Sequence, residues 1–197
     1  MSGHDFSRAE ELRRGSRALA PAMSKPARPS DAECRTGKPR LFFVTTRTAG
    51  GRALFQTERM ANLLIEVLRT QVRLRRFVVH EFVVMPNHLH ILLTLPGELS
   101  LEKAIQFVKG GFSFQAKRAL GFSGEVWQRG FSDVWVADED SFEQHKEYIH
   151  MNPVRAGLAT SPDGFPFSTA FFKKQKQPGA KAPHPLETPA GTTQVVP

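Results

Sequence analysis

Two histidines, His88 and His90, stand two residues apart in the stretch NHLHILL. The apolar residues around them predict a β-strand, and alternate residues of a strand point to the same face, so both imidazoles can converge on one point. Such a pair is half of a metal site, although two half-buried histidines without a metal would give the same pattern. His80 and His145 are further candidates that lack a comparable partner.

Tyr148 is the only tyrosine of a chain that contains 16 phenylalanines, and it lies in the stretch EYIHMNPVRAGL. A helix is predicted here, which puts Asn152 one turn after Tyr148 and on the same stripe. A phenylalanine could pack equally well at position 148, so the one phenol hydroxyl of the chain calls for an explanation. One explanation is a core aromatic with its hydroxyl at the rim, followed by a residue that ends the helix before Pro153.

Composition indicates an anionic partner, because the formal net charge is +8 and the pI is about 10.1. Nucleic acid fits better than a membrane surface, since the sequence has neither a basic amphipathic terminal helix nor a lipidation signal. One cysteine, Cys34, excludes a disulfide framework. No apolar run reaches membrane length and no secretory signal is present, so we expect a cytoplasmic protein.

The chain divides by composition into three parts. Residues 1–38 are rich in Arg, Ala, Pro and Ser, and residues 172–197 are rich in Pro, Lys and Thr, so both are predicted to be disordered tails. The domain between them, residues 39–171, carries all the periodic apolar segments that can form a core.

The elements of this domain follow the order βαββαβα. That order predicts an α+β fold, a ferredoxin-like βαββαβ antiparallel sheet covered by helices, with an added C-terminal helix that carries Tyr148. We expect the second helix to be interrupted at Gly110 and Gly111, and the last helix to stop near Asn152. The predicted strands are 40–48, 77–86, 88–96 and 133–138, and the predicted helices are 57–75, 100–109 with a continuation over 112–120, and 141–151.

Three stretches together resemble one known family. RLFFVTTRT, FVVMPNHLHILL and GEVWQRGFSDVWVADEDSFEQHKEYIHMNPVRAGL are similar to the REP-associated tyrosine transposases, relatives of the single-strand transposases of the HUH superfamily. The resemblance covers residues 39–171. His-hydrophobe-His followed at this distance by Tyr-Ile-x-x-Asn-Pro is far more specific than either motif alone.

The resemblance implies roles for four residues. His88, His90 and Asn152 would hold a divalent cation, and Tyr148 would attack DNA to form a 5′-phosphotyrosine. The implied substrate is single-stranded DNA next to short imperfect hairpins, the repetitive extragenic palindromes. Nitrogen and oxygen ligands with open positions fit Mg²⁺ or Mn²⁺ better than Zn²⁺. The implied enzyme is a monomer, with a homodimer as the alternative.

Cations and aromatic residues alternate between positions 109 and 135, as expected of a surface that binds phosphates and stacks on bases. Most of these aromatics are nevertheless expected in the core. Trp127, Gln128 and Arg129 precede a glycine in a predicted loop, and Arg155 follows the tyrosine helix. The predicted DNA contacts are Arg47, Lys109, Lys117, Trp127, Gln128, Arg129 and Arg155.

Two other classes of function remain open. A non-catalytic DNA- or RNA-binding module is the first, since ferredoxin-like sheets also bind RNA, but the aromatic RNA-recognition motif is absent. A metal-dependent hydrolase of small phosphoesters is the second, and it is disfavoured by the lack of clustered carboxylates near the histidines. Covalent capture of DNA separates the transposase from both.

Overall fold

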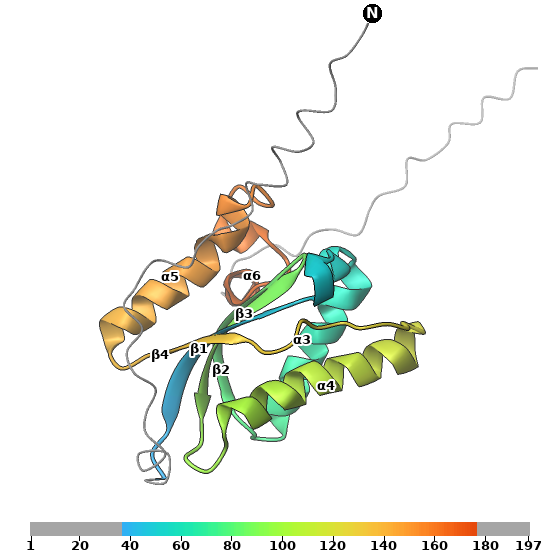
Figure 1. Ribbon diagram of the computed structural model, residues 1–197. Helices are drawn as coiled ribbons and strands as arrows, with labels where there is room; N and C mark the ends of the chain where they lie inside the picture. Colours follow the sequence, from blue (N-terminus) through green and yellow to red (C-terminus); the bar gives the residue numbers. More distant parts are fainter. Residues whose placement is uncertain (1–36, 177–197) are drawn as a thin grey trace, which may run out of the picture.

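A four-stranded antiparallel sheet organises the computed structural model, which describes residues 37–176 (Figure 1). Its strand order is β2-β3-β1-β4, so the two outer strands flank the central pair β3 and β1. This is the predicted ferredoxin-like arrangement, and the α+β fold class is confirmed. The strands are β1 Arg40–Arg47, β2 Val78–Met85, β3 His88–Leu95 and β4 Ser132–Trp135.

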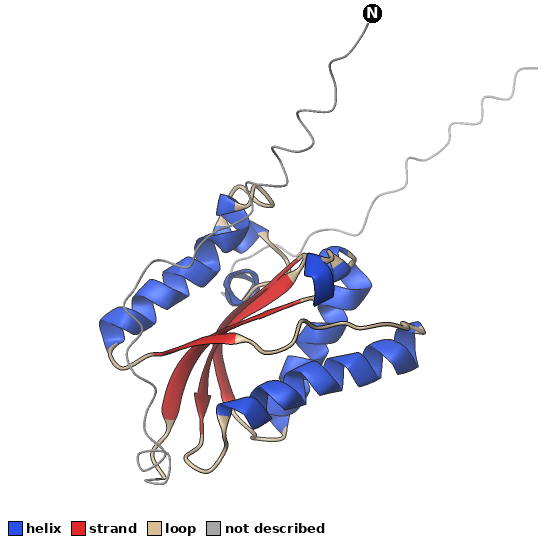
Figure 2. Ribbon diagram, in the orientation of Figure 1, coloured by secondary structure: helices blue, strands red, loops and turns tan. Residues whose placement is uncertain are grey.

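Helices cover both faces of the sheet (Figure 2). Helices α3 and α4 pack side by side on one face, and α5 lies on the other. The helices are α3 Glu58–Arg73, α4 Leu101–Leu120, α5 Glu139–Arg155 and α6 Thr169–Lys176. Short 3₁₀ turns, η1 Ala49–Gly51, η2 Leu54–Gln56 and η3 Pro162–Gly164, complete the connections.

Alternation along the central strands fills two separate cores. In β1, Phe42 and Val44 point toward α3 and α4, whereas Phe43 points toward α5. The core beneath α3 and α4 is the larger one. The core beneath α5 is smaller, and it contains Tyr148 and Ile149. The tyrosine helix is therefore held to the sheet by its own set of contacts.

Helix α4 is continuous across Gly110 and Gly111, so the predicted interruption is wrong. Gly111 faces α3, where an added Cβ would lie 3.2 Å from Cγ1 of Val67. A glycine at this position lets the two helices approach closely, and packing offsets the low helix propensity. Nothing lies within 4 Å of a Cβ added at Gly110.

Helix α5 continues to Arg155, past the end predicted near Asn152. Pro153 lies inside the helix and is buried, but only the final turn follows it, so its missing N–H costs one intrahelical bond. The carbonyls of Asn152 and of Pro153 itself are satisfied, because Ala156 N donates to Asn152 O at 3.0 Å and Leu158 N donates to Pro153 O at 2.8 Å.

The segment after α5 returns to the sheet. Val84 N of β2 donates to Phe167 O at 2.9 Å, and Ser168 forms an isolated bridge with Val83, so this segment pairs with part of the outer edge of β2. Helix α6, which was not predicted, follows and spans the predicted domain boundary at residue 171. Most of the predicted disordered arm, residues 1–36, and most of the predicted tail, residues 177–197, lie outside the described residues. Between residues 37 and 176, no helix has the length and apolar character needed to cross a membrane.

Candidate active site

His88 and His90 lie at one end of β3 and face α5, as the strand alternation predicts. Their ring centroids are 4.6 Å apart. His88 pairs in register with Arg47 at the end of β1, and His90 pairs with Thr45. The hairpin turn of Pro86 and Asn87 joins β2 to β3 directly before this pair, which places the histidines where the central strand β3 begins.

Each histidine is oriented through its Nδ1 atom. His88 Nδ1 donates to Oδ1 of Asn87 at 2.6 Å, and His90 Nδ1 shares a 2.7 Å hydrogen bond with the Thr45 hydroxyl. His90 is buried, and its Nε2 atom has no hydrogen-bond partner. Buried polar atoms are nearly always satisfied by protein, water or an ion, so this nitrogen is available to bind an ion or a water molecule.

Both imidazoles are held in the neutral form, which is the form that binds metals. Burial lowers the pKa of His88 to about 4, and the nearby Arg47 adds to the effect. Burial also lowers the pKa of His90 well below its usual value, with further contributions from His88 and Arg47.

Tyr148 reaches this pair from α5. Helix α5 begins with Asp138 as its N-cap, whose carboxylate accepts from Ser141 N at 2.8 Å. The Tyr148 ring is buried against the sheet, with its centroid 5.2 Å from that of His90 and 5.8 Å from that of Phe43. The structure thus brings together a phenol and two imidazoles that lie far apart in the sequence.

Asn152 and two arginines surround the phenol. Burial raises the pKa of Tyr148, while a hydrogen bond from the Asn152 side chain and the charges of Arg155 and Arg47 partly offset the rise. Asn152 is buried, and the Arg155 guanidinium carbon lies 5.7 Å from the Tyr148 ring centroid. An amide that donates to the phenol can still present its oxygen to a cation.

A buried carboxylate that the sequence analysis missed ties α5 and α6 to the sheet. Glu81 of β2 accepts from His150 Nε2 of α5 at 2.9 Å and from the Thr169 hydroxyl of α6 at 2.5 Å, and it pairs with Lys173. Burial alone would raise the pKa of Glu81, but the hydrogen bonds from His150, Lys173 and Thr169 lower it to about 2. A glutamate within a largely apolar strand was the available signal.

We expect Glu81→Gln to destabilise the fold at neutral pH by about 2 to 3 kcal/mol, because the lowered pKa of the folded state reports stability of that order. Glu81 contributes this stability above its ordinary pKa of 4.5, and the contribution is lost as the pH falls toward 2. Urea unfolding at pH 7, 4.5 and 3 measures it. The exposed Glu147→Gln on α5 is the control. An unchanged pH dependence in Glu81→Gln would contradict the assignment.

The predicted DNA contacts separate into two groups. Arg47, Gln128, Arg129 and Arg155 are exposed. The Gln128 backbone N donates to Arg47 O at 2.9 Å, so the loop before β4 lies beside the histidine end of β1. Arg155 lies beside Tyr148. Arg47 and Arg155 therefore lie at the candidate site, and Gln128 lies next to Arg47 in the loop before β4.

The other predicted contacts lie elsewhere or have packing roles. Trp127 is 7% exposed and its Nε1 donates to Lys109 O. Its ring therefore lies in the core and presents no open face on which a base could stack. Lys109 Nζ donates to Gln128 O at 2.7 Å and to Gly130 O at 2.9 Å, which fixes the loop. Lys117 is exposed on α4.

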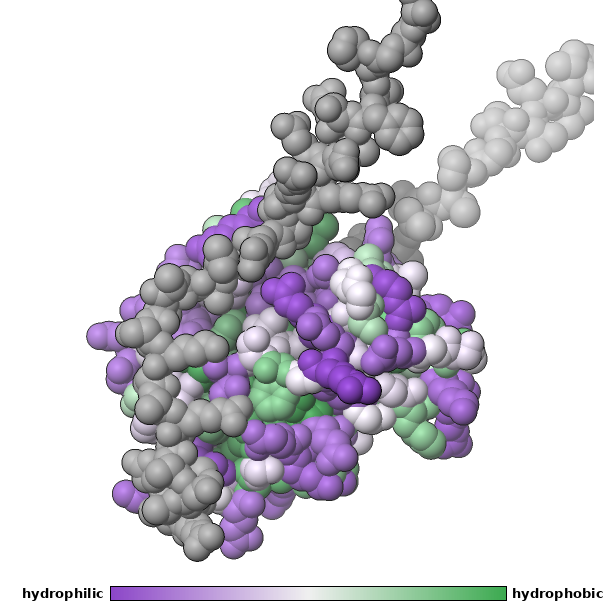
Figure 3. All heavy atoms as spheres, viewed as in Figure 1, coloured by the Kyte–Doolittle hydropathy of each residue, from purple (hydrophilic) through white to green (hydrophobic). Residues whose placement is uncertain are grey.

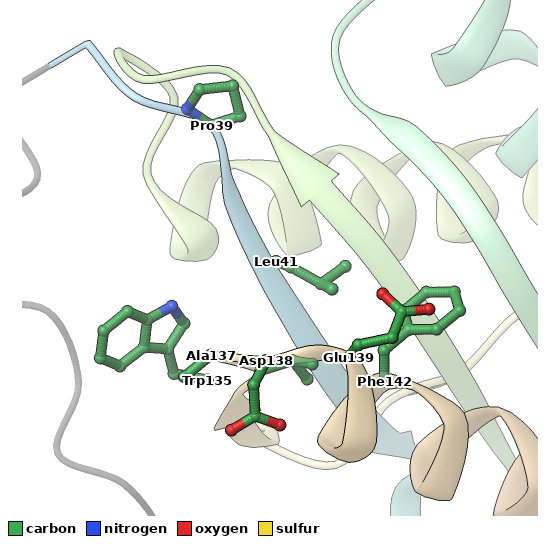
Figure 4. A pocket seen from close by; sticks show the side chains of 8 residues that line it. Pro39, Leu41, Trp135, Ala137, Asp138, Glu139 and Phe142 are labelled. Carbon is green, nitrogen blue, oxygen red and sulfur yellow. The ribbon is translucent and has the colours of Figure 1, made fainter.

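A pocket of about 400 Å³ lies at the opposite end of β1 (Figure 4). Leu41, Trp135 and Phe142 supply its apolar lining, and Asp138 and Glu139 supply carboxylates from the start of α5. It holds none of the predicted site residues. Within the described part of the chain, no group of three or more His, Cys, Asp or Glu side chains is placed to hold a metal. A metal at the tyrosine site would therefore rest on the two histidines and an amide.

Comparisons with known proteins identify the family of the chain. Residues 42–152 match the family model described as "Transposase IS200 like". A REP-associated tyrosine transposase of Escherichia coli K12 is 28% identical over 129 residues, which cover 65% of this chain and 74% of that protein. A solved structure of a REP-associated tyrosine transposase bound to a REP hairpin shares the fold, with a TM-score of 0.58 and 24% identity over 88% of this chain and all of that one. The family model spans more than half of the chain and contains both histidines, the tyrosine and the asparagine, and the chain belongs to the IS200-like transposase family.

Proposed function

We propose that this transposase cuts and rejoins single-stranded DNA through a covalent 5′-phosphotyrosine on Tyr148, with the help of a divalent cation. The observation that carries the proposal is the position of the Tyr148 ring beside His90, whose Nε2 is buried and unpaired. A structural tyrosine would have no need of an unsatisfied imidazole next to it. Membership of a transposase family makes DNA the expected substrate.

The residues present fit a divalent cation. His90 Nε2 lacks a partner, and the Nδ1 atoms of both histidines are occupied, which leaves each Nε2 as the free nitrogen. His88, His90 and the Asn152 amide oxygen would hold Mg²⁺ or Mn²⁺, whose positive charge would neutralise non-bridging phosphate oxygens during attack.

Tyr148 supplies the nucleophile. Its oxygen bonds to phosphorus while the bond from phosphorus to the 3′ oxygen breaks, and overall the phenol proton is transferred to that 3′ oxygen. The products are a 5′-phosphotyrosine and a free 3′-hydroxyl. Attack by a 3′-hydroxyl on the phosphotyrosine is the reverse reaction: the bond from phosphorus to the 3′ oxygen forms, the bond to Tyr148 breaks, and the proton returns to the phenol. The strand is thereby rejoined without an external energy source. Because burial raises the pKa of Tyr148, its proton must be removed during attack, and the charges of Arg47 and Arg155 favour the phenolate.

The substrate we propose is single-stranded DNA beside a REP-like hairpin. Arg47 and Arg155 lie at the site, and Gln128 and Arg129 belong to the exposed loop beside Arg47. All four can contact phosphates or bases. The support from relatives is the name of the E. coli protein and the hairpin bound in the solved structure of similar fold.

A denaturing gel of purified protein with labelled hairpin oligonucleotides tests the proposal. Oligonucleotides drawn from the genomic surroundings of the gene are incubated with Mn²⁺, Mg²⁺ or EDTA. We expect a protein-linked DNA band that requires the metal. If the oligonucleotides bind but no covalent band forms with either metal, the result would instead favour a non-catalytic DNA-binding module.

Thr45 is expected to act through His90. Its hydroxyl shares a hydrogen bond with His90 Nδ1, which fixes the ring and its tautomer. Thr45→Val keeps the shape but removes this bond, so we expect Mn²⁺ affinity to fall by about tenfold or more. Calorimetric titration with Mn²⁺ measures the change. Thr94→Val, which removes the equivalent partner of His80 at 2.8 Å, should leave Mn²⁺ affinity unchanged.

A further inference from the structure

The solvent-facing side of α4 carries aromatic and cationic residues at helical spacing. Residues three and four apart share one face of a helix, and here they form a continuous line. We call this line the outer stripe of α4. It consists of Lys103, Phe107, Gly110, Phe114, Lys117 and Arg118.

Phe114 is the exposed ring of the stripe. It is 61% exposed, whereas Phe112, two residues earlier, is fully buried in the core. Phe107 is covered by the guanidinium of Arg76, whose carbon lies 3.9 Å from the ring centroid. Phe114 therefore presents a bare aromatic face to solvent, one turn before two exposed cations, Lys117 and Arg118.

Gly110 lies one turn before Phe114 and has no role in packing. Gly111 is explained by the close approach of Val67, but a Cβ at Gly110 would meet nothing within 4 Å. Glycine inside a helix is less stable than alanine, so a position without packing constraint gains nothing from it inside the folded chain. A close approach of another molecule to the helix backbone beside Phe114 would account for it.

The stripe is separate from the tyrosine site but connected to it. Helices α3 and α4 cover the face of the sheet opposite α5. Lys109, next to Gly110, donates hydrogen bonds to the carbonyls of Gln128 and Gly130, and this loop runs beside Arg47.

Hydrophilic residues gather over α4 with hydrophobic side chains between them (Figure 3). The charges of Lys103, Lys117 and Arg118 suit a polyanion.

We propose that the outer stripe of α4 binds single-stranded DNA, with an unpaired base stacked on Phe114 and phosphates on Lys117 and Arg118. Aromatic faces next to cations form the usual surface for unpaired nucleotides. The inference rests on the proposed function, because it takes the transposase substrate as the occupant. It adds a DNA-binding surface on the face of the sheet away from the nucleophile.

The test measures DNA binding in the Tyr148→Phe background, where cleavage cannot interfere. We expect Phe114→Ala to weaken binding of a single-stranded hairpin oligonucleotide by about tenfold, and Phe114→Trp to restore it. Val78→Ala, which trims an exposed apolar side chain on β2, is the control. A 2-aminopurine placed along the single strand should be quenched at one position, and Phe114→Ala should abolish that quenching. Wild-type affinity and quenching in Phe114→Ala would overturn the proposal.

Two further variants separate the stripe from general effects on folding. Gly110→Leu should raise the melting temperature, because leucine is the better helix former and has open space, and should weaken DNA binding. Changing Lys117 and Arg118 to Ala should reduce the slope of log Kd against log salt by about 1 to 1.5. Unchanged binding in both variants counts against the stripe. Failure of Tyr148 chemistry would leave these binding results intact, so the two proposals fail separately.

Discussion

Tyr148→Phe is expected to lower the rate of DNA strand cleavage by a factor on the order of 10⁴ or more, because it removes the only atom of the residue that can attack phosphorus. The ring remains, so its packing against Phe43 and His90 is preserved. The loss of one hydrogen bond with Asn152 changes the free energy of unfolding by about 1 kcal/mol. Single-turnover cleavage of a hairpin oligonucleotide measures the rate.

Binding provides the control for this variant. Affinity for the same oligonucleotide should stay within about twofold of wild type, since the arginines around the site are unchanged. A variant that still cuts at the wild-type rate would show that another group is the nucleophile. A variant that neither cuts nor binds would show that the hydroxyl serves substrate binding.

His90→Phe is expected to abolish metal-dependent cleavage, lowering the rate by a factor on the order of 10³ or more, while the fold becomes no less stable. Phenylalanine fills a similar volume among Phe43 and Tyr148. It also removes the buried Nε2 that has no partner, which stabilises by about 1 kcal/mol, and this gain offsets the similar loss of the hydrogen bond between His90 Nδ1 and the Thr45 hydroxyl. Cleavage kinetics and Mn²⁺ titration measure the loss of metal-dependent activity, and urea unfolding measures the stability of the fold.

His80→Phe is the matched control. His80 is also a strand histidine bonded to a threonine of the neighbouring strand, Thr94, but its ring lies against Phe142 and not against Tyr148. We expect full cleavage and unchanged Mn²⁺ affinity in this variant. If both histidine variants lose activity equally, the effect comes from the sheet and not from a metal site at His90.

The parts of the site that depend on local periodicity were predictable from sequence. Alternation along a strand places His88 and His90 on one face, and helical spacing places Asn152 one turn after Tyr148. The predicted order of strands and helices was sufficient to indicate which strands lie next to each other in the sheet. Thr45 and Glu81 were not found, because their roles depend on cross-strand register and on a helix, α6, that had not been predicted.

The errors in the predicted elements came from glycine and proline. Gly110 and Gly111 lower helix propensity, but contacts between α4 and α3 outweigh that local preference. Pro153 disfavours a helical residue before it, yet α5 needs only the final turn beyond it. Trp127 was predicted to contact DNA from its neighbours in sequence, and in the structure its indole packs against Phe55 and Phe112. In each case contacts between distant residues determined the outcome.

The division of the interior into two cores has a consequence for access to the proposed nucleophile. Tyr148 is 4% exposed, so under the proposed mechanism a scissile phosphate would gain full access to its side chain when that side chain turns outward or α5 shifts on the sheet. Such a shift disturbs the smaller core alone and leaves the packing of α3 and α4 intact. Under the proposed mechanism, the tyrosine oxygen would be kept latent until substrate arrives, and the rate of that opening would set an upper limit on the rate of cutting.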